Sequence, residues 1–196
     1  MTANLKRENL ILRSWSLLHR VRDVLMKCED ERFGEYGLTS EQYGVLVTMK
    51  YIGESARPTD IARWLTRSPN SISMIVDRMV KVGLVRRVRS RGDRREVRVI
   101  ITNNGENALK PATVDGLEFI RKIMLPLSDE DLSTFIRLLE MVRREAFECL
   151  NQEVTIEEMR GSDITSQADL MKKLREYSLP STPQAKRQGG KKGKTI

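Results

Sequence analysis

Residues 58–102 constrain the fold of this chain most, because they encode two short helices followed by two arginine-rich strands. Pro58-Thr59-Asp60 opens the first helix, and Ser68-Pro69 opens the second with an N-cap serine and a proline at the first helical position. Apolar residues then recur three and four positions apart, as one buried helical face requires, at Ile72, Ile75, Val76 and Met79. The segment predicts a helix-turn-helix joined directly to a β-hairpin.

The predicted hairpin spans residues 84–90 and 96–102, with a turn that contains Gly92. Apolar residues alternate along its second strand, at Val97, Val99 and Ile101. Seven arginines fall within thirteen residues: Arg86, Arg87, Arg89, Arg91, Arg94, Arg95 and Arg98. Because like charges at one tip repel each other unless an anion receives them, this pattern favours insertion into a DNA minor groove.

Basic charge is concentrated in two places along the chain. The formal net charge is +8, and residues 57–98 alone hold 12 Lys/Arg against 4 Asp/Glu. The tail from residue 180 adds 5 basic residues and no acidic one, so the remainder, with 18 basic and 23 acidic residues, is acidic. A basic module and a basic tail on an acidic body favour a polyanionic partner.

The rest of the chain predicts a mainly α-helical protein. Long helices are expected over residues 5–32, 39–53, 102–124 and 128–150. Thr39 or Ser40 caps the second of these, with Gln42 three residues after Thr39 as in a capping box, and Pro111 should kink or break the third. The apolar face of residues 5–32 is so wide that it needs more than one neighbour to cover it.

The second helix of the helix-turn-helix has the properties of a recognition helix, since small polar side chains lie near its N-terminus, where such helices enter the major groove. Its candidate DNA-binding residues are Ser68, Asn70, Ser71, Ser73, Met74 and Arg78. Asparagine suits an adenine edge, serine suits bases or phosphates, and arginine suits a phosphate. Taken alone, a polar helical face is more often a solvated surface, but the hairpin beside it favours DNA binding.

The run from Asp60 to Thr102 resembles the MarR family of winged helix-turn-helix regulators. The resemblance rests on Asp93-Arg94-Arg95 before the strand that ends at Ile101-Thr102, and on Asp77-Arg78, Gly83-Leu84-Val85, and Leu38-Thr39 with Gln42-Tyr43. It covers approximately residues 5–150, and Ser90-Arg91-Gly92 departs from the usual lead into the wing.

The resemblance implies a transcriptional regulator that acts as a repressor. It also implies a homodimer in which the first and last helices of the two protomers intertwine. Each protomer would present one recognition helix and one wing to a pseudo-palindromic operator. In the wing, the candidate DNA-binding residues are Arg91, Asp93, Arg94 and Arg95, with Asp93 bracing Arg95 for the minor groove.

On this basis the chain divides into five parts. They are a dimerisation helix at 1–37, a winged helix-turn-helix domain at 38–102, dimerisation helices at 103–150, a partly helical extension at 151–179 and a basic disordered tail at 180–196.

Many members of this family release DNA when a small acid, often aromatic, binds between the dimer helices and the DNA-binding lobe. The resemblance therefore implies an effector pocket, for which the candidate residues are Trp15, His19, Arg22, Tyr36, Tyr43 and Met49. His19 and Arg22 would meet an anionic effector. A lone histidine on a charged helix is, however, more often a surface or packing residue.

Other classes of function find little support in the sequence. The two cysteines, Cys28 and Cys149, lie far apart in a chain that begins without a secretory signal, which favours a reducing cytoplasm. Acidic neighbours of Cys28 disfavour a reactive thiolate. We expect no metal, no cofactor, no membrane span and no enzymatic activity. The alternative function is a non-specific or architectural nucleic-acid-binding protein, which would lack the ~10³-fold sequence preference of a regulator.

Overall fold

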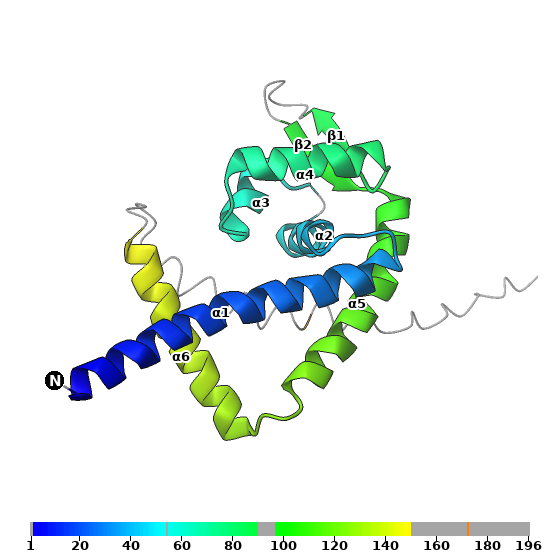
Figure 1. The fold of residues 1–196 in the computed structure, drawn as a ribbon. Coiled ribbons are helices and arrows are strands. Elements are labelled where there is room, and N and C mark those ends of the chain that lie inside the picture. The colour runs from blue at the N-terminus through cyan, green and yellow to red at the C-terminus, as the bar shows by residue number, and fades with distance from the viewer. Residues whose placement is uncertain (1, 54, 90–96, 150–171, 173–196) are drawn as a thin grey trace, which may run out of the picture.

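The computed structural model describes residues 2–53, 55–89, 97–149 and 172 (Figure 1). Its elements are α1 (Thr2–Gly34), α2 (Ser40–Ile52), α3 (Pro58–Trp64), α4 (Pro69–Lys81), β1 (Val85–Arg89), β2 (Val97–Ile101), α5 (Asn103–Met124) and α6 (Asp129–Glu148). The prediction of a mainly α-helical fold with one hairpin is confirmed. The tip of the hairpin, and the expected extension and tail except for residue 172, lie outside the described residues.

α2, α3, α4 and the hairpin pack together around one hydrophobic core, with α1 and α5 along its edge (Figure 1). The four residues expected on the inner face of α4 are all buried, as are Ile61 and Ala62 of α3. From α2 the core receives Val45, Leu46 and Met49. The hydrophobic spacing in the sequence therefore identified the inner face of α4.

The hairpin is attached to the helices through β2. β1 and β2 are antiparallel, with Val85 opposite Ile101 and Arg87 opposite Val99. Val99 is fully buried, and its backbone N–H and C=O bond to Ala56 at 2.9 and 3.3 Å. This isolated bridge places the stretch before α3 beside β2, so the described base of the wing has a fixed position relative to the helix-turn-helix.

The helices begin where capping chemistry predicts. Thr39 and Gln42 form the expected capping box at α2. Ser68, Thr102 and Ser128 are the N-caps of α4, α5 and α6, and each side chain accepts a hydrogen bond from a backbone N–H three residues later. Each cap satisfies a donor that would otherwise lack a partner in the first turn.

Pro111 does not break the third long helix, contrary to one of the two outcomes expected from the sequence. α5 runs as one helix from Asn103 to Met124 with Pro111 inside it. The proline removes the donor that would bond the carbonyl of Asn107, and both residues are exposed. Water can hydrate that carbonyl, which explains why the helix tolerates the proline.

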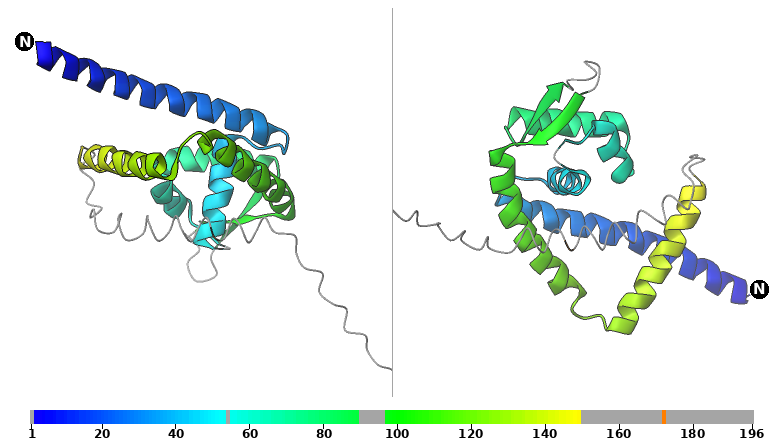
Figure 2. Two further views of the ribbon diagram at one scale, coloured as in Figure 1. Left: turned by 90° about the horizontal axis from the view of Figure 1, so that it is seen from below. Right: turned by 180° about the vertical axis from the view of Figure 1, so that it is seen from behind.

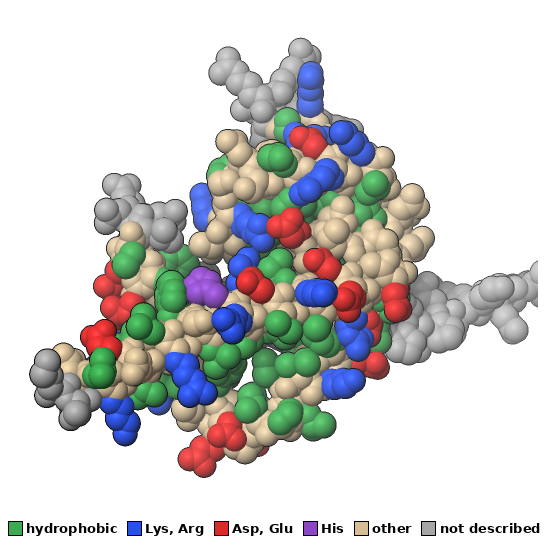
Figure 3. Space-filling model, viewed as in Figure 1, with side chains coloured by type: hydrophobic (Ala, Val, Ile, Leu, Met, Phe, Trp, Pro, Cys, Tyr) green, Lys and Arg blue, Asp and Glu red, His purple; other side chains and the backbone are tan. Residues whose placement is uncertain are grey.

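The long helices leave a broad apolar surface uncovered (Figure 3). α6 buries none of its residues in the single chain. α1 and α6 cross in the view of Figure 1 but lie apart in the left view of Figure 2. Large apolar side chains that are more than one third exposed on these helices include Leu10, Ile11, Trp15, Leu17, Val21, Val24, Ile120, Ile123, Phe135, Ile136, Leu139 and Val142. The face that the sequence predicted to need additional cover therefore lacks it in one protomer.

Candidate nucleic-acid interface

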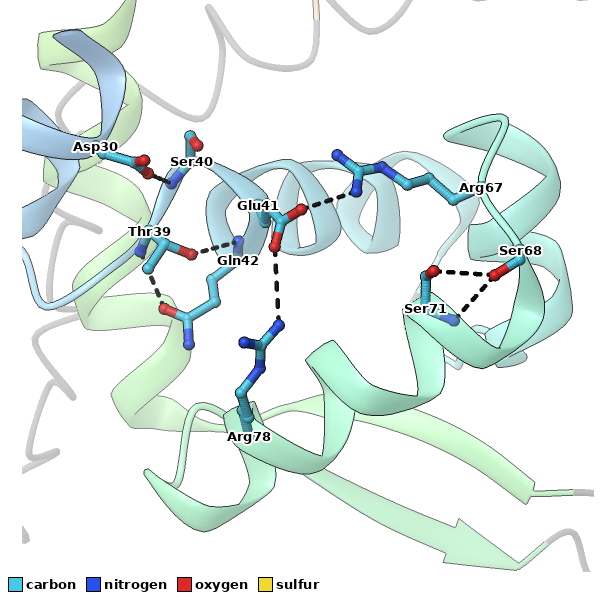
Figure 4. Close-up of polar contacts among 9 residues, drawn as sticks. All are labelled: Asp30, Thr39, Ser40, Glu41, Gln42, Arg67, Ser68, Ser71 and Arg78. Atoms are coloured by element: carbon cyan, nitrogen blue, oxygen red, sulfur yellow. Dashed lines mark hydrogen bonds and ion pairs between the residues drawn. The ribbon is translucent and has the colours of Figure 1, made fainter. Parts of the chain in front are cut away.

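The N-terminal turn of α4 is held by its own side chains (Figure 4). The hydroxyl oxygen of Ser68 accepts a hydrogen bond from the backbone N–H of Ser71 at 3.1 Å and lies 2.9 Å from the Ser71 hydroxyl. Pro69 fixes the backbone of the first helical residue. Backbone donors of a fixed first turn, together with the helix dipole, favour an anion such as phosphate.

The outer face of α4 is open to solvent. Asn70 and Met74 are exposed, Met74 to 66%, whereas Ser71 and Ser73 are half-buried along the edges of that face. Arg78 is exposed as well. The structure thus brings the predicted α4 residues to one side of the helix, opposite its buried face.

Ion pairs hold α4 along both of its edges. On the edge beside the hairpin, Nη2 of Arg87 lies 2.8 Å from Oδ1 of Asp77 and 3.5 Å from the backbone oxygen of Ser73. On the opposite edge, Nη2 of Arg78 lies 3.7 Å from Oε2 of Glu41 on α2. The sequence showed these charges but not their pairing, which depends on the packing of α2 and β1 against α4.

The base of the wing presents basic side chains. Arg86, Arg87 and Arg89 are exposed on β1, while Arg98 on β2 is half-buried and donates a hydrogen bond to the backbone oxygen of Ser55 at 3.4 Å. The four candidate residues at the tip, Arg91, Asp93, Arg94 and Arg95, lie outside the described residues. The bracing of Arg95 by Asp93 stays a prediction.

The six candidate effector residues do not meet in one protomer. Trp15 and His19 contact each other edge to face on exposed α1, with ring centroids 4.7 Å apart. Tyr36 lies in the turn after α1, so the stretch of helix from His19 to Gly34 separates the two side chains by about 20 Å at ~1.5 Å per helical residue. Arg22 is exposed and pairs with neighbouring Asp23.

Two of the six belong to the core region. Met49 is 1% exposed and is a core residue, as its place on the apolar face of α2 also indicated. The ring of Tyr43 stacks on Phe33 with centroids 4.1 Å apart. Burial raises the pKa of Tyr43, and a hydrogen bond with Thr113 partly offsets this rise. These two residues support the junction of α1, α2 and α5.

Tyr36 does line a cavity of about 450 Å³ between the end of α1 and the middle of α5. The other lining residues are Cys28, Glu31, Arg32, Glu35, Asp115, Phe119, Lys122 and Ile123. Arg32 pairs with Asp115 across the two helices and lies over the ring of Phe119, 5.1 Å from its centroid. The residues of this wall carry no signal in the sequence, because they come from segments far apart in the chain and follow no common period.

Burial and nearby charge raise the pKa of two groups near the end of α1, Glu29 and Tyr36. Burial raises the pKa of Tyr36, and the neighbouring Asp115 adds to the rise. Burial likewise raises the pKa of Glu29, with a further contribution from Asp30. Among the described residues, no group of His, Cys, Asp and Glu has an arrangement that would hold a metal ion. None of the helices in the described ranges is long and apolar enough to cross a membrane.

Comparison with known proteins agrees with this architecture. Residues 36–96 match the model of the MarR family. The transcriptional regulator PecS of Dickeya dadantii is 26% identical over 129 residues, which is 65% of this chain and 78% of PecS. The Escherichia coli regulator PapX is 25% identical over 130 residues, covering 66% of this chain and 77% of PapX.

Solved structures show the same fold. A mutant of MarR from E. coli complexed with operator DNA superposes with a TM-score of 0.63 at 22% identity, covering 68% of this chain and 96% of the other. The organohalide-sensing regulator RdhR-CbdbA1625, bound to 2,4-dichlorophenol, gives a TM-score of 0.69 at 20% identity over 74% of this chain and 86% of the other. The fold and the exposed helix beside a basic hairpin define a winged helix-turn-helix protein. Over residues 36–96 the chain is similar to the MarR family, and its related regulators are HTH-type transcriptional regulators.

Proposed function

We propose that this chain is a sequence-specific, DNA-binding transcriptional regulator. The observation that supports this most directly is the placement of α4, whose open face lies next to a hairpin with three exposed arginines at its base. Its relatives PecS and PapX are themselves HTH-type transcriptional regulators. A helix of this kind reads base edges, while arginines of the wing contact phosphates and the minor groove.

The proposed contacts follow from that placement. Asn70, Ser71, Ser73 and Met74 face the major groove, while Ser68 and Arg78 contact phosphates. For the wing, we retain the predicted set Arg91, Asp93, Arg94 and Arg95, with Arg95 in the minor groove and Asp93 orienting it.

The active form is proposed to be a homodimer. The uncovered apolar side chains of α1, α5 and α6 support this assembly, because a monomer would leave them in water. In this scheme residues 1–37 and 103–150 form the dimerisation part and 38–102 the DNA-binding domain, while 151–179 and 180–196 are an extension and a basic tail. Two copies of α4 related by a twofold axis match a pseudo-palindromic operator, at which the bound dimer represses transcription.

A small effector is proposed to release the DNA. The cavity between α1 and α5 is the site we assign to it, since the aromatic rings of Tyr36 and Phe119 and the basic Arg32 and Lys122 line one space. A related fold, that of RdhR-CbdbA1625, has been solved with 2,4-dichlorophenol bound. An aromatic or anionic molecule fits the lining chemistry. We assign the protein no enzymatic role and place its action in the cytoplasm.

Selection from a library of random duplexes tests this function. We expect the full-length protein to enrich a motif with twofold symmetry, and to bind that motif ~10³-fold or more tightly than random duplex at the same salt concentration. Equal affinity for both duplexes would overturn the regulator and favour a non-specific nucleic-acid-binding protein. Sedimentation of the complex would give the number of protomers bound to each site.

A further inference from the structure

Glu41, in the first turn of α2, contacts arginines near both ends of the recognition helix (Figure 4). Its Oε1 accepts a hydrogen bond from Nη1 of Arg67 at 2.7 Å, and its Oε2 lies 3.7 Å from Nη2 of Arg78. Arg67 immediately precedes Ser68, the N-cap of α4, and Arg78 lies in the last turn of that helix. A single carboxylate therefore holds two cations along the edge of α4 that faces α2.

The backbone around Glu41 is fixed by side chains on both sides. Thr39 and Gln42 cap each other, with the two hydrogen bonds at 3.0 and 3.2 Å. The backbone N–H of Ser40 donates to Oδ1 of Asp30 on α1 at 2.7 Å. These contacts fix the backbone from which the Glu41 side chain projects, so the position of its carboxylate does not depend on the two arginines alone.

We propose that Glu41 is a positioning residue that keeps Arg67 and Arg78 away from DNA phosphates until α4 is seated in a matching site. The inference rests on the proposed function. Both arginine side chains remain accessible, at 37% and 63% exposure, and an exposed ion pair is weak enough for a phosphate to replace it. A carboxylate at this position therefore reduces contacts that carry no sequence information.

Removing the Glu41 carboxylate would change the affinity for DNA most on a random duplex. Non-specific binding depends almost entirely on phosphate contacts, and each neutralised phosphate changes the slope of log Kobs against log salt by about −0.9. On unmatched duplex, the two arginines stay paired with Glu41 and therefore contribute little to phosphate contacts. Replacing the carboxylate with a neutral amide would free up to two arginines, whatever the DNA sequence.

The test compares full-length variants on one random duplex by fluorescence anisotropy over a series of salt concentrations. Glu41→Gln should bind more tightly and steepen the slope by about 1–2. Glu41→Asp, which keeps the charge, should stay near the wild-type slope. The double variant Glu41→Gln with Arg78→Gln should have a slope that is shallower by about 1 than that of Glu41→Gln alone. Glu118→Gln removes the same charge from the exposed side of α5 and should leave the slope unchanged.

Circular dichroism first establishes that each variant is folded. A slope for Glu41→Gln equal to that of Glu118→Gln would overturn the inference. Weaker binding of the folded Glu41→Gln variant to random duplex would do the same, because the carboxylate would then assist phosphate contacts. Failure of the proposed function differs from both results, since the wild-type protein itself would then bind its selected motif no more tightly than random duplex.

Discussion

Gly105 lies at the corner where the wing meets α5, and an alanine there should destabilise the protein. An added Cβ would collide with the carbonyl oxygen of Leu84 and approach Cγ2 of Ile101 to 2.7 Å. That carbonyl already accepts a hydrogen bond from the backbone N–H of Thr102 at 3.0 Å. It cannot move aside without weakening the link between the start of the hairpin at Leu84 and the N-cap of α5 at Thr102.

Opposing contributions determine the size of this effect. Alanine in place of glycine favours a helix by up to about 1 kcal/mol. Overpacking a filled site costs about 1–3 kcal/mol, and weakening one hydrogen bond costs about 0.5–1.5 kcal/mol. The steric cost should exceed the gain in helix propensity. We therefore expect Gly105→Ala to lower the free energy of unfolding by about 1–3 kcal/mol.

Urea unfolding followed by far-UV circular dichroism measures this difference at one protein concentration, because the stability of the proposed dimer would depend on concentration. Gly44→Ala is the matched control. Gly44 also lies within a helix, and an added Cβ meets no atom within 4 Å. It should stabilise the protein by about 0.5–1 kcal/mol. A Gly105→Ala protein as stable as wild type would refute the steric argument.

Further predictions concern the wing, the apolar surface and pH. Arg95→Ala should weaken operator binding by about 1–3 kcal/mol in an anisotropy titration without unfolding the protein; wild-type affinity would remove Arg95 from the interface. Leu17→Asp, at a position 57% exposed on α1, should yield monomers in sedimentation, whereas Val82→Asp, at 62% exposure after α4, should leave the dimer intact. A dimeric Leu17→Asp protein would exclude this part of α1 from the interface. Because burial raises the pKa of Glu29, the folded state binds its proton more tightly than the unfolded state does. Stability should therefore fall as pH rises from 4.5 through the folded pKa, and Glu29→Gln should reduce this fall in urea titrations at several pH values; an unchanged pH profile would contradict it.

Features set by neighbours in the sequence were the ones that could be predicted. The capping box at Thr39, the caps at Ser68 and Ser128, and the buried face of α4 depend on residues within a few positions of one another. The hairpin is similarly local: its first strand begins at Val85, one residue later than predicted, and its second ends at Ile101, one residue earlier than predicted. The sequence therefore predicted which face of α4 is buried and which is open to solvent.

Contacts between distant segments could not be predicted in the same way. Arg67 and Glu41 are 26 positions apart, and Arg32 and Asp115 are 83 apart. A chain rich in both signs of charge offers many alternative pairs, and only packing selects among them. In the single protomer the effector candidates do not lie together, because helical spacing gives the face of a residue but does not identify what covers it. Met49 is a core residue.

The end of α1 links the cavity to the recognition helix through few intermediates. Arg32 lines the cavity, and Asp30, two residues earlier, accepts the hydrogen bond from the backbone N–H of Ser40. Because one helical turn moves as a unit, a displacement of Arg32 by a ligand would also act on the start of α2, where Glu41 follows Ser40. Transmission of a signal requires a contact with two available arrangements. Of the contacts named between Asp30 and α4, the pair of Glu41 with Arg78 is the longest, at 3.7 Å, and its arginine side chain is 63% exposed, so this pair would be the first to separate.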